Sequence, residues 1–83
     1  MWPQSEVKRR VLVCAARKLG LRLYEGSKHT NIEQVSSGFK TQIPRHPNVK
    51  RETAKAIVRF LIEQMGFSEK EVYDALGVKS DKL

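Results

Sequence analysis

Residues 21–43 read LRLYEGSKHTNIEQVSSGFKTQI, and apolar and polar side chains alternate along most of this stretch. A period of two is typical of strands with one buried face. Turn residues at 26–27 and 36–38 interrupt the alternation, and Pro44 ends it because proline cannot donate to a neighbouring strand. The sequence therefore predicts a three-stranded antiparallel meander, over about residues 21–24, 29–35 and 39–43.

A first helix is predicted before the meander, over residues 6–19, because apolar residues recur there at helical spacing. Ser5 is the expected N-cap and Gly20 the expected stop. The stripe expected to face the core comprises Val7, Val11, Cys14, Ala15 and Leu19. Cys14 is interpreted as a small core residue.

Two more helices are predicted after the meander. Residues 51–65 carry apolar side chains in the i, i+3, i+4, i+7 pattern of a helix with one buried face. Ser68 and Glu71 have the spacing of a capping box for a short helix over residues 69–76, which Gly77 would end. Residues 79–83 are expected to be a frayed tail.

This order of elements predicts an α+β fold with two layers. Two helices would cover one face of the sheet, the short C-terminal helix would be an addition, and the other face of the sheet would be open to solvent. With 83 residues the chain is expected to form a single domain, 1–83. A domain of this size has a small core, so a ligand site would be a surface or a shallow groove.

Composition and charge exclude several classes of protein. There is no apolar run long enough to span a membrane and no signal-peptide pattern, and the lone cysteine suits a reducing compartment, so a cytoplasmic location is predicted. The two histidines, seventeen positions apart, have no zinc-site spacing, and phosphate-loop and dinucleotide motifs are absent, so no metal or cofactor is predicted.

The net charge of +7 is concentrated in the first two thirds of the chain. Residues 1–24 carry six basic and one acidic side chain, residues 25–51 five and two, and residues 52–83 five and six. This asymmetry favours a polyanionic partner on one side of the molecule. In the helix over residues 51–65, the exposed side chains Arg51, Lys55 and Arg59 are four positions apart and would be aligned.

His29 is the candidate for chemistry. It is expected on one face of the second strand with Asn31 and Glu33, whereas Thr30 and Ile32 would lie on the other face. A histidine can accept and return a proton at neutral pH, and the RNA 2′-hydroxyl is a built-in nucleophile. Spacing alone leaves open a partly exposed histidine that only bonds a strand end. His46 is interpreted as a phosphate or backbone contact.

Short segments of this chain resemble the HicA toxin family of small mRNA interferases from toxin–antitoxin systems. The resemblance covers about residues 6–66 and rests on Glu25-Gly26-Ser27-Lys28-His29-Thr30, Ile43-Pro44-Arg45-His46, and Glu52-Thr53-Ala54 with Ile57. It implies a fold similar to the double-stranded RNA-binding domain, with the order α-β-β-β-α. It also implies that His29 is catalytic and that the partners are mRNA and a HicB-like antitoxin. The chain departs from the family pattern at Ile32, Glu33 and Glu52.

The main hypothesis is therefore a metal-independent ribonuclease toxin in which His29 acts as general base. The residues expected to bind RNA are Lys28, Lys40, Arg45, His46, Lys50, Arg51, Lys55 and Arg59. A non-catalytic nucleic-acid-binding module is the alternative, and a protein-interaction domain that uses the last helix is a third reading.

Overall fold

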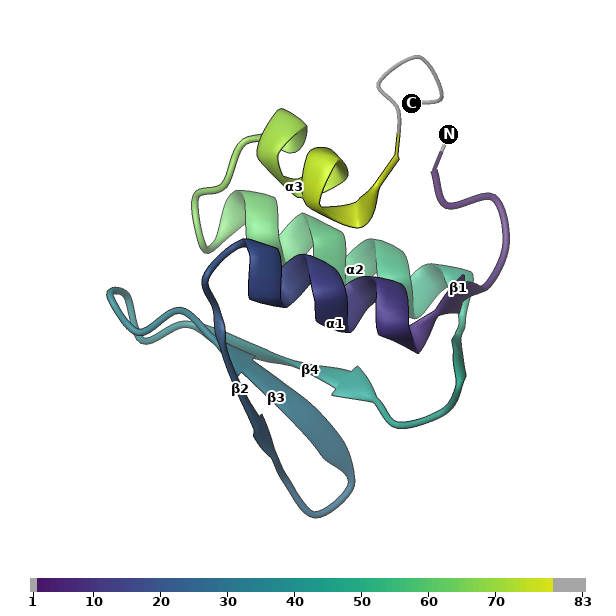
Figure 1. Ribbon diagram of the computed structural model, residues 1–83, viewed down its shortest axis with the longest axis horizontal. Coiled ribbons are helices and arrows are strands. Elements are labelled where there is room, and N and C mark those ends of the chain that lie inside the picture. The colour runs from purple at the N-terminus through teal and green to yellow at the C-terminus, as the bar shows by residue number, and fades with distance from the viewer. Residues whose placement is uncertain (1, 79–83) are drawn as a thin grey trace.

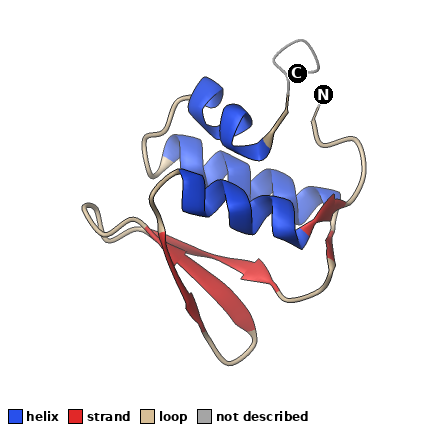
Figure 2. Ribbon diagram, viewed as in Figure 1, coloured by secondary structure: helices blue, strands red, loops and turns tan. Residues whose placement is uncertain are grey.

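The computed structural model describes residues 2–78, which form an α+β domain with a three-stranded antiparallel sheet and three helices (Figures 1 and 2). The helices are α1 (Arg9–Lys18), α2 (Arg51–Glu63) and α3 (Glu69–Leu76). The sheet contains β2 (Arg22–Glu25), β3 (His29–Glu33) and β4 (Lys40–Pro44) in that order, and β1 (Val7–Lys8) pairs with β5 (Asn48–Val49).

The meander forms as the alternation predicts. Leu23 lies opposite Ile32, and Ile32 lies opposite Thr41, so these side chains share the inner face. Thr30 and Ile32 are buried, while His29, Asn31 and Glu33 lie half-buried on the outer face. The third strand differs at both ends: Phe39 precedes β4 and is exposed, and Pro44 is the last residue of β4.

Both long helices pack on the inner face of the sheet, as the sequence predicts. Ile32 and Ile43 from the sheet meet Leu12 of α1 and Ile57 of α2 in one apolar core. In Figure 1, α3 lies over α1 and α2 on the side away from the sheet, and it packs against both. The helix pair is therefore covered on two sides, whereas no element within residues 2–78 covers the outer face of the sheet.

The start of the first helix is a correction to the sequence prediction. Ser5 does not cap it; α1 begins at Arg9, and Lys8 at the N-cap makes no side-chain cap bond. The reason is that Val7 is extended and pairs with Val49, which buries both side chains. The main-chain N–H of Arg9 then donates to the Pro47 carbonyl at 2.9 Å, which satisfies one donor of the helix start.

Cys14 is exposed, which contradicts its assignment to the core. The buried side of α1 consists of Leu12, Val13, Ala15 and Ala16. Successive residues are about 100° apart around a helix, so Cys14 lies opposite both Leu12 and Ala16. The predicted apolar stripe was counted from Val7, which lies in β1 and not in the helix.

The last helix forms as predicted. The Ser68 hydroxyl accepts from the Glu71 N–H and the Glu71 carboxylate accepts from the Ser68 N–H, which completes the capping box. Gly77 follows with φ of 77°, a left-handed conformation that favours glycine.

Helix α2 ends at Glu63, two residues before the predicted end, although Met65 is still buried. The tail predicted over residues 79–83 lies outside the described residues. None of the described helices is long and apolar enough to cross a membrane.

Candidate functional site

His29 follows directly on a tight turn between β2 and β3. The Gly26 N–H donates to the His29 carbonyl at 2.8 Å, and the two residues between them, Ser27 and Lys28, are exposed. A β-carbon at position 26 would lie 2.8 Å from Asn31 Nδ2 and 3.1 Å from the His29 carbonyl oxygen. A side chain at this position would displace the Asn31 amide and crowd the His29 carbonyl, so the close approach favours glycine.

The turn is tied to the end of β4 by Arg45. Its Nη2 lies 2.9 Å from Glu25 Oε1, and it also donates to the Gly26 carbonyl. His29 itself lies opposite Pro44 in the β3–β4 ladder. Arg45 therefore holds the β2 end of the turn, at Glu25 and Gly26, beside the end of β4.

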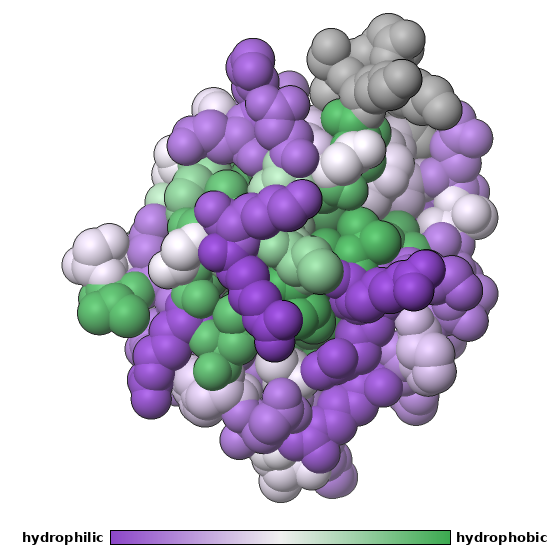
Figure 3. All heavy atoms as spheres, in the orientation of Figure 1, coloured by the Kyte–Doolittle hydropathy of each residue, from purple (hydrophilic) through white to green (hydrophobic). Residues whose placement is uncertain are grey.

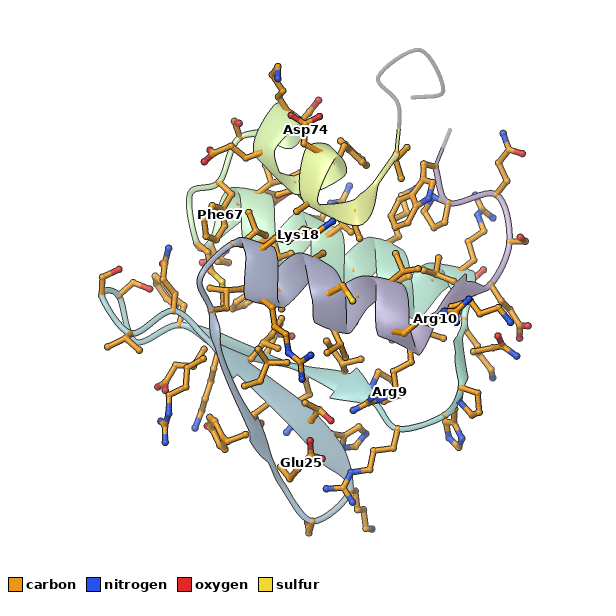
Figure 4. The ribbon with its side chains drawn as sticks, in the orientation of Figure 1. Arg9, Arg10, Lys18, Glu25, Phe67 and Asp74 are labelled. Carbon is orange, nitrogen blue, oxygen red and sulfur yellow. The ribbon has the colours of Figure 1, made fainter. Side chains whose placement is uncertain are left out.

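The same carboxylate connects to the core through Thr30. The Thr30 hydroxyl donates to Glu25 at 3.1 Å and accepts from the Arg9 guanidinium. In Figure 4 the Arg9 side chain extends from the start of α1 toward the end of the sheet that carries Glu25. The result is a chain of polar contacts, Arg9–Thr30–Glu25–Arg45, which passes from α1 to the turn.

The sequence places Arg9 off the apolar stripe of the first helix and leaves open a solvated helix face or a phosphate contact; the structure shows that its side chain is not fully solvated. Arg9 is half-buried, and its Nε is buried without a hydrogen-bond partner among the described residues. Its position follows from the β1–β5 ladder, which sets the start of α1 beside Pro47. A two-residue strand is too short to show a periodic pattern. The only available sequence signal for this ladder was that Val7 and Val49 are both β-branched apolar residues.

An open groove of about 600 Å³ runs between the sheet and α2, and His29 is one of the residues that line it. Asn31 and Gln42 line it from the outer face of the sheet, and their side-chain amides lie 3.4 Å apart. The wall from α2 consists of Thr53, Ala56, Ile57 and Phe60. One face of His29 is therefore accessible to a bound molecule.

Five of the predicted RNA-binding residues lie near this groove or in the segments that lead from it. Lys28 precedes His29, Lys40 lines the groove, and Arg45 is part of the polar chain described above. His46 follows Arg45 in the exposed connection to β5, and Lys50 is exposed just before α2. Arg45 is less free than its sequence suggested, because Glu25 and Gly26 already engage its guanidinium.

Arg51, Lys55 and Arg59 do not join the His29 groove. At about 100° per residue, they lie on nearly the opposite side of α2 from the groove wall. Arg51 Nε donates to the Pro3 carbonyl at 2.9 Å, and Arg59 Nε lies 3.2 Å from Glu63 Oε2. Lys55 and Arg59 line a separate cleft of about 380 Å³ with Trp2 and Tyr73.

The residues at which the chain departs from the HicA pattern have clear positions. Ile32 is buried on the inner face and belongs to the core. Glu33 lies on the outer face, where its Oε1 is 3.0 Å from Arg22 Nη1 and its strand partner is Lys40. Glu52 is exposed in the first turn of α2, where a carboxylate suits the helix dipole.

Within residues 2–78, no three His, Cys, Asp or Glu side chains lie together as a metal site requires.

Comparisons with known proteins give no relative. No protein-family model matches the sequence, and no curated protein and no solved structure matches the chain.

Proposed function

We propose that this chain is a metal-independent endoribonuclease of the HicA type, the toxin component of a toxin–antitoxin pair. The observation that carries the proposal is the position of His29. It lies at an accessible groove, directly after a turn that Gly26 and Arg45 hold in place. The net charge of +7 would attract RNA to the molecule. The resemblance in the segments around His29, Arg45 and Thr53 supports the same reading.

The chemistry needs only one well-placed base. His29 takes the proton from a ribose 2′-hydroxyl, whose oxygen attacks the adjacent phosphorus. The bond from phosphorus to the 5′-oxygen of the next nucleotide then breaks, and that oxygen takes a proton from solvent. The products are a 2′,3′-cyclic phosphate and a 5′-hydroxyl. Lys28 is exposed beside His29 and offsets charge that develops on the phosphate.

Arg45 has two parts in this proposal. It holds the turn through Glu25 and Gly26, and its side chain is still 44% exposed. Its remaining N–H groups are therefore available to a phosphate oxygen. Lys40 and Lys50 extend the positive field along the exposed segments around the groove, and His46 adds an exposed hydrogen-bonding side chain there. Arg51, Lys55 and Arg59 contact RNA only where the RNA passes around α2.

The partners follow from the same proposal. The protein acts in the cytoplasm on mRNA, and a HicB-like antitoxin silences it by covering the side of the sheet that carries His29. Growth arrest on induced expression of the wild-type chain, but not of His29→Ala, is the expected result in a bacterial host.

The direct test measures cleavage of a labelled RNA in the presence of EDTA. His29→Ala should reduce the rate by roughly 10² to 10⁴, the usual contribution of a general base. His46→Ala is the matched control: His46 is proposed to contact RNA but lies outside the groove lining, so this variant should weaken RNA binding and leave the cleavage rate at saturating RNA close to that of wild type. A substrate with one 2′-deoxyribose should resist cleavage at that position. Equal rates for wild type and His29→Ala would disprove the assignment.

The alternative is a non-catalytic nucleic-acid-binding module on the same fold. The outer face of the sheet favours it, since Tyr24 is accessible there and the Arg22 guanidinium lies 4.7 Å from the Tyr24 ring centroid. An aromatic side chain with a stacked cation on an open sheet is a suitable platform for a nucleotide base. This alternative gives salt-dependent RNA binding without cleavage, and His29→Ala changes neither.

A further inference from the structure

Strand β4 has a free edge. The order of the sheet is β2-β3-β4, so no strand in the described part of the chain pairs with the far side of β4. The Gln34 N–H donates to the Phe39 carbonyl at 2.9 Å, which marks these two as a hydrogen-bonded pair. Such pairs alternate along an antiparallel ladder, so Thr41 and Ile43 bond to β3 while the main-chain groups of Lys40 and Gln42 point outward.

Nothing among the described residues occupies these outward groups. No hydrogen bond outside the ladder uses the N–H or C=O of Lys40 or Gln42. Both residues are exposed, so solvent satisfies their main-chain groups in the free protein. They form a row of two donors and two acceptors at the spacing that another strand would match.

The groove lies along this edge. Lys40, Thr41, Gln42 and Pro44 line it from β4, and the facing wall of α2 contributes the small side chain of Ala56 and the ring of Phe60. Phe39 packs edge to face against Phe60 with ring centroids 6.4 Å apart, and it is 45% exposed. In Figure 3, apolar side chains project from the tip of the loop that joins β3 to β4, where Val35 is exposed.

We propose that β4 accepts an extended segment of a partner protein as an additional strand. Main-chain bonds to Lys40 and Gln42 hold it, and alternate apolar side chains enter the groove beside Ala56 and Phe60. The other side chains of the segment are acidic, because Lys40 lines the groove and the chain has a net charge of +7. His29 lines the same groove, so the bound segment also covers His29. The binding mode goes beyond the proposed ribonuclease activity and stands whether or not His29 cleaves RNA.

Two other occupants fit less well. A second copy of this chain is disfavoured by its charge of +7 and by Lys40 and Pro44, which are typical of edges protected against self-association. RNA would reach His29 at the Pro44 end of the groove, but it fits the stretch beside Lys40 and Gln42 less well, because the α2 wall of Thr53, Ala56, Ile57 and Phe60 carries no charge. A phosphate backbone in this stretch would lack cations on one side.

The test uses an acetylated octapeptide of alternating glutamate and valine, titrated into ¹⁵N-labelled protein. The expected result is slower hydrogen exchange at the Lys40 and Gln42 amides, with shift changes confined to β4 and the α2 wall. Two N-methylated peptides, one methylated on every valine and one on every glutamate, supply a matched control. Only alternate N–H groups of a strand face its neighbour, so one of the two should bind and the other should not.

A pair of protein variants tests the same bonds from the other side. Gln42→Pro removes an N–H that points away from β3, a position at which an edge strand tolerates proline. Gln42→Thr keeps the N–H and changes only the side chain. Gln42→Pro should lower the affinity for the peptide about tenfold, and Gln42→Thr should lower it less than about twofold. Circular dichroism establishes whether Gln42→Pro is folded; if it is not, the N-methylated peptides decide the question on the wild-type chain.

Several results would overturn the proposal. These are equal binding of both N-methylated peptides, equal binding by folded Gln42→Pro and Gln42→Thr, or no binding of the octapeptide at millimolar concentration. A ten-nucleotide RNA that protects the Lys40 and Gln42 amides and competes with the peptide would assign the groove to RNA. RNA cleavage by Gln42→Thr, measured in parallel, shows whether the ribonuclease proposal fails separately.

Discussion

At the scale of single residues, Thr30 connects the core to the His29 turn. It is buried on the inner face of β3, yet its hydroxyl bridges the Arg9 guanidinium and the Glu25 carboxylate. One positive and one negative group thus meet at one hydroxyl, and Arg45 lies on the other side of Glu25. The exposed Glu25–Arg45 pair by itself contributes little to stability. The chain of contacts therefore acts by orienting the turn that precedes His29.

Thr30→Val tests this connection. The substitution keeps the shape of the side chain but leaves the half-buried Arg9 without its acceptor, which should cost about 1–3 kcal/mol of unfolding free energy. Urea denaturation measures that cost. Thr41→Val is the control on the same face of the sheet and should change stability by less than about 0.5 kcal/mol. Equal stability of wild type and Thr30→Val would mean that solvent replaces the lost hydrogen bonds.

Residue positions were predictable where strand alternation decides them. The alternation placed His29 on the opposite face from Thr30 and Ile32, and the structure confirms this; which of the two faces is buried follows from the packing of the helices. It did not reveal that Arg9 and Arg45 engage the ends of the same turn, because those contacts join residues far apart in the chain. Nor did it show that Arg51, Lys55 and Arg59 lie away from His29. Their position depends on which side of α2 faces the sheet, and the packing of the helix on the sheet decides this.

At the scale of elements, local signals differ in their strength. Ser68 with Glu71 forms a capping box, because two side chains and two main-chain groups bond reciprocally within one turn. Ser5 had no such partner, and the tertiary pairing of Val7 with Val49 prevailed over it. The start of α3 was therefore predictable, because it depends on side chains within its own first turn. The start of α1 was not, because it depends on the pairing of Val7 with a distant strand.

The capping box also permits a prediction for α3. Ser68→Ala should cost about 1 kcal/mol, because the Glu71 N–H loses its acceptor. Thermal unfolding followed by circular dichroism measures the change. Ser68→Asp preserves an acceptor at the N-cap and should be close to wild type. If Ser68→Ala and Ser68→Asp lower the melting temperature equally, the cap contributes nothing to stability.

At the scale of the whole molecule, the chain has two distinct sides. The sheet presents His29 and the groove, whereas α3 and the segment before β1 enclose an aromatic contact on the far side of α2. There the rings of Trp2 and Tyr73 meet edge to face with centroids 5.9 Å apart. Burial first, and the charge of Glu69 second, raise the pKa of the Tyr73 hydroxyl above its ordinary value.

This shift predicts a loss of stability in alkali. The unfolded chain releases the phenolic proton near its ordinary pKa of about 10, and the folded chain retains it to higher pH. Stability from this group is therefore full below that pH and falls as the pH rises through the folded pKa. Urea unfolding at pH 8 and pH 11 should show a larger decrease for wild type than for Tyr73→Phe. Tyr24→Phe, on the other side of the molecule, should behave as wild type does.

The pairing of β1 with β5 has a consequence for how the chain could be divided. A break in the exposed loop at residues 36–38 separates β1, α1, β2 and β3 from β4, β5, α2 and α3. Each fragment then holds one strand of both the β1–β5 and the β3–β4 ladders, so each lacks partners that only the other supplies. His29 belongs to the first fragment and the α2 wall of its groove to the second. Division at this loop would convert the domain into a two-part reporter whose halves gain the site only on reassembly.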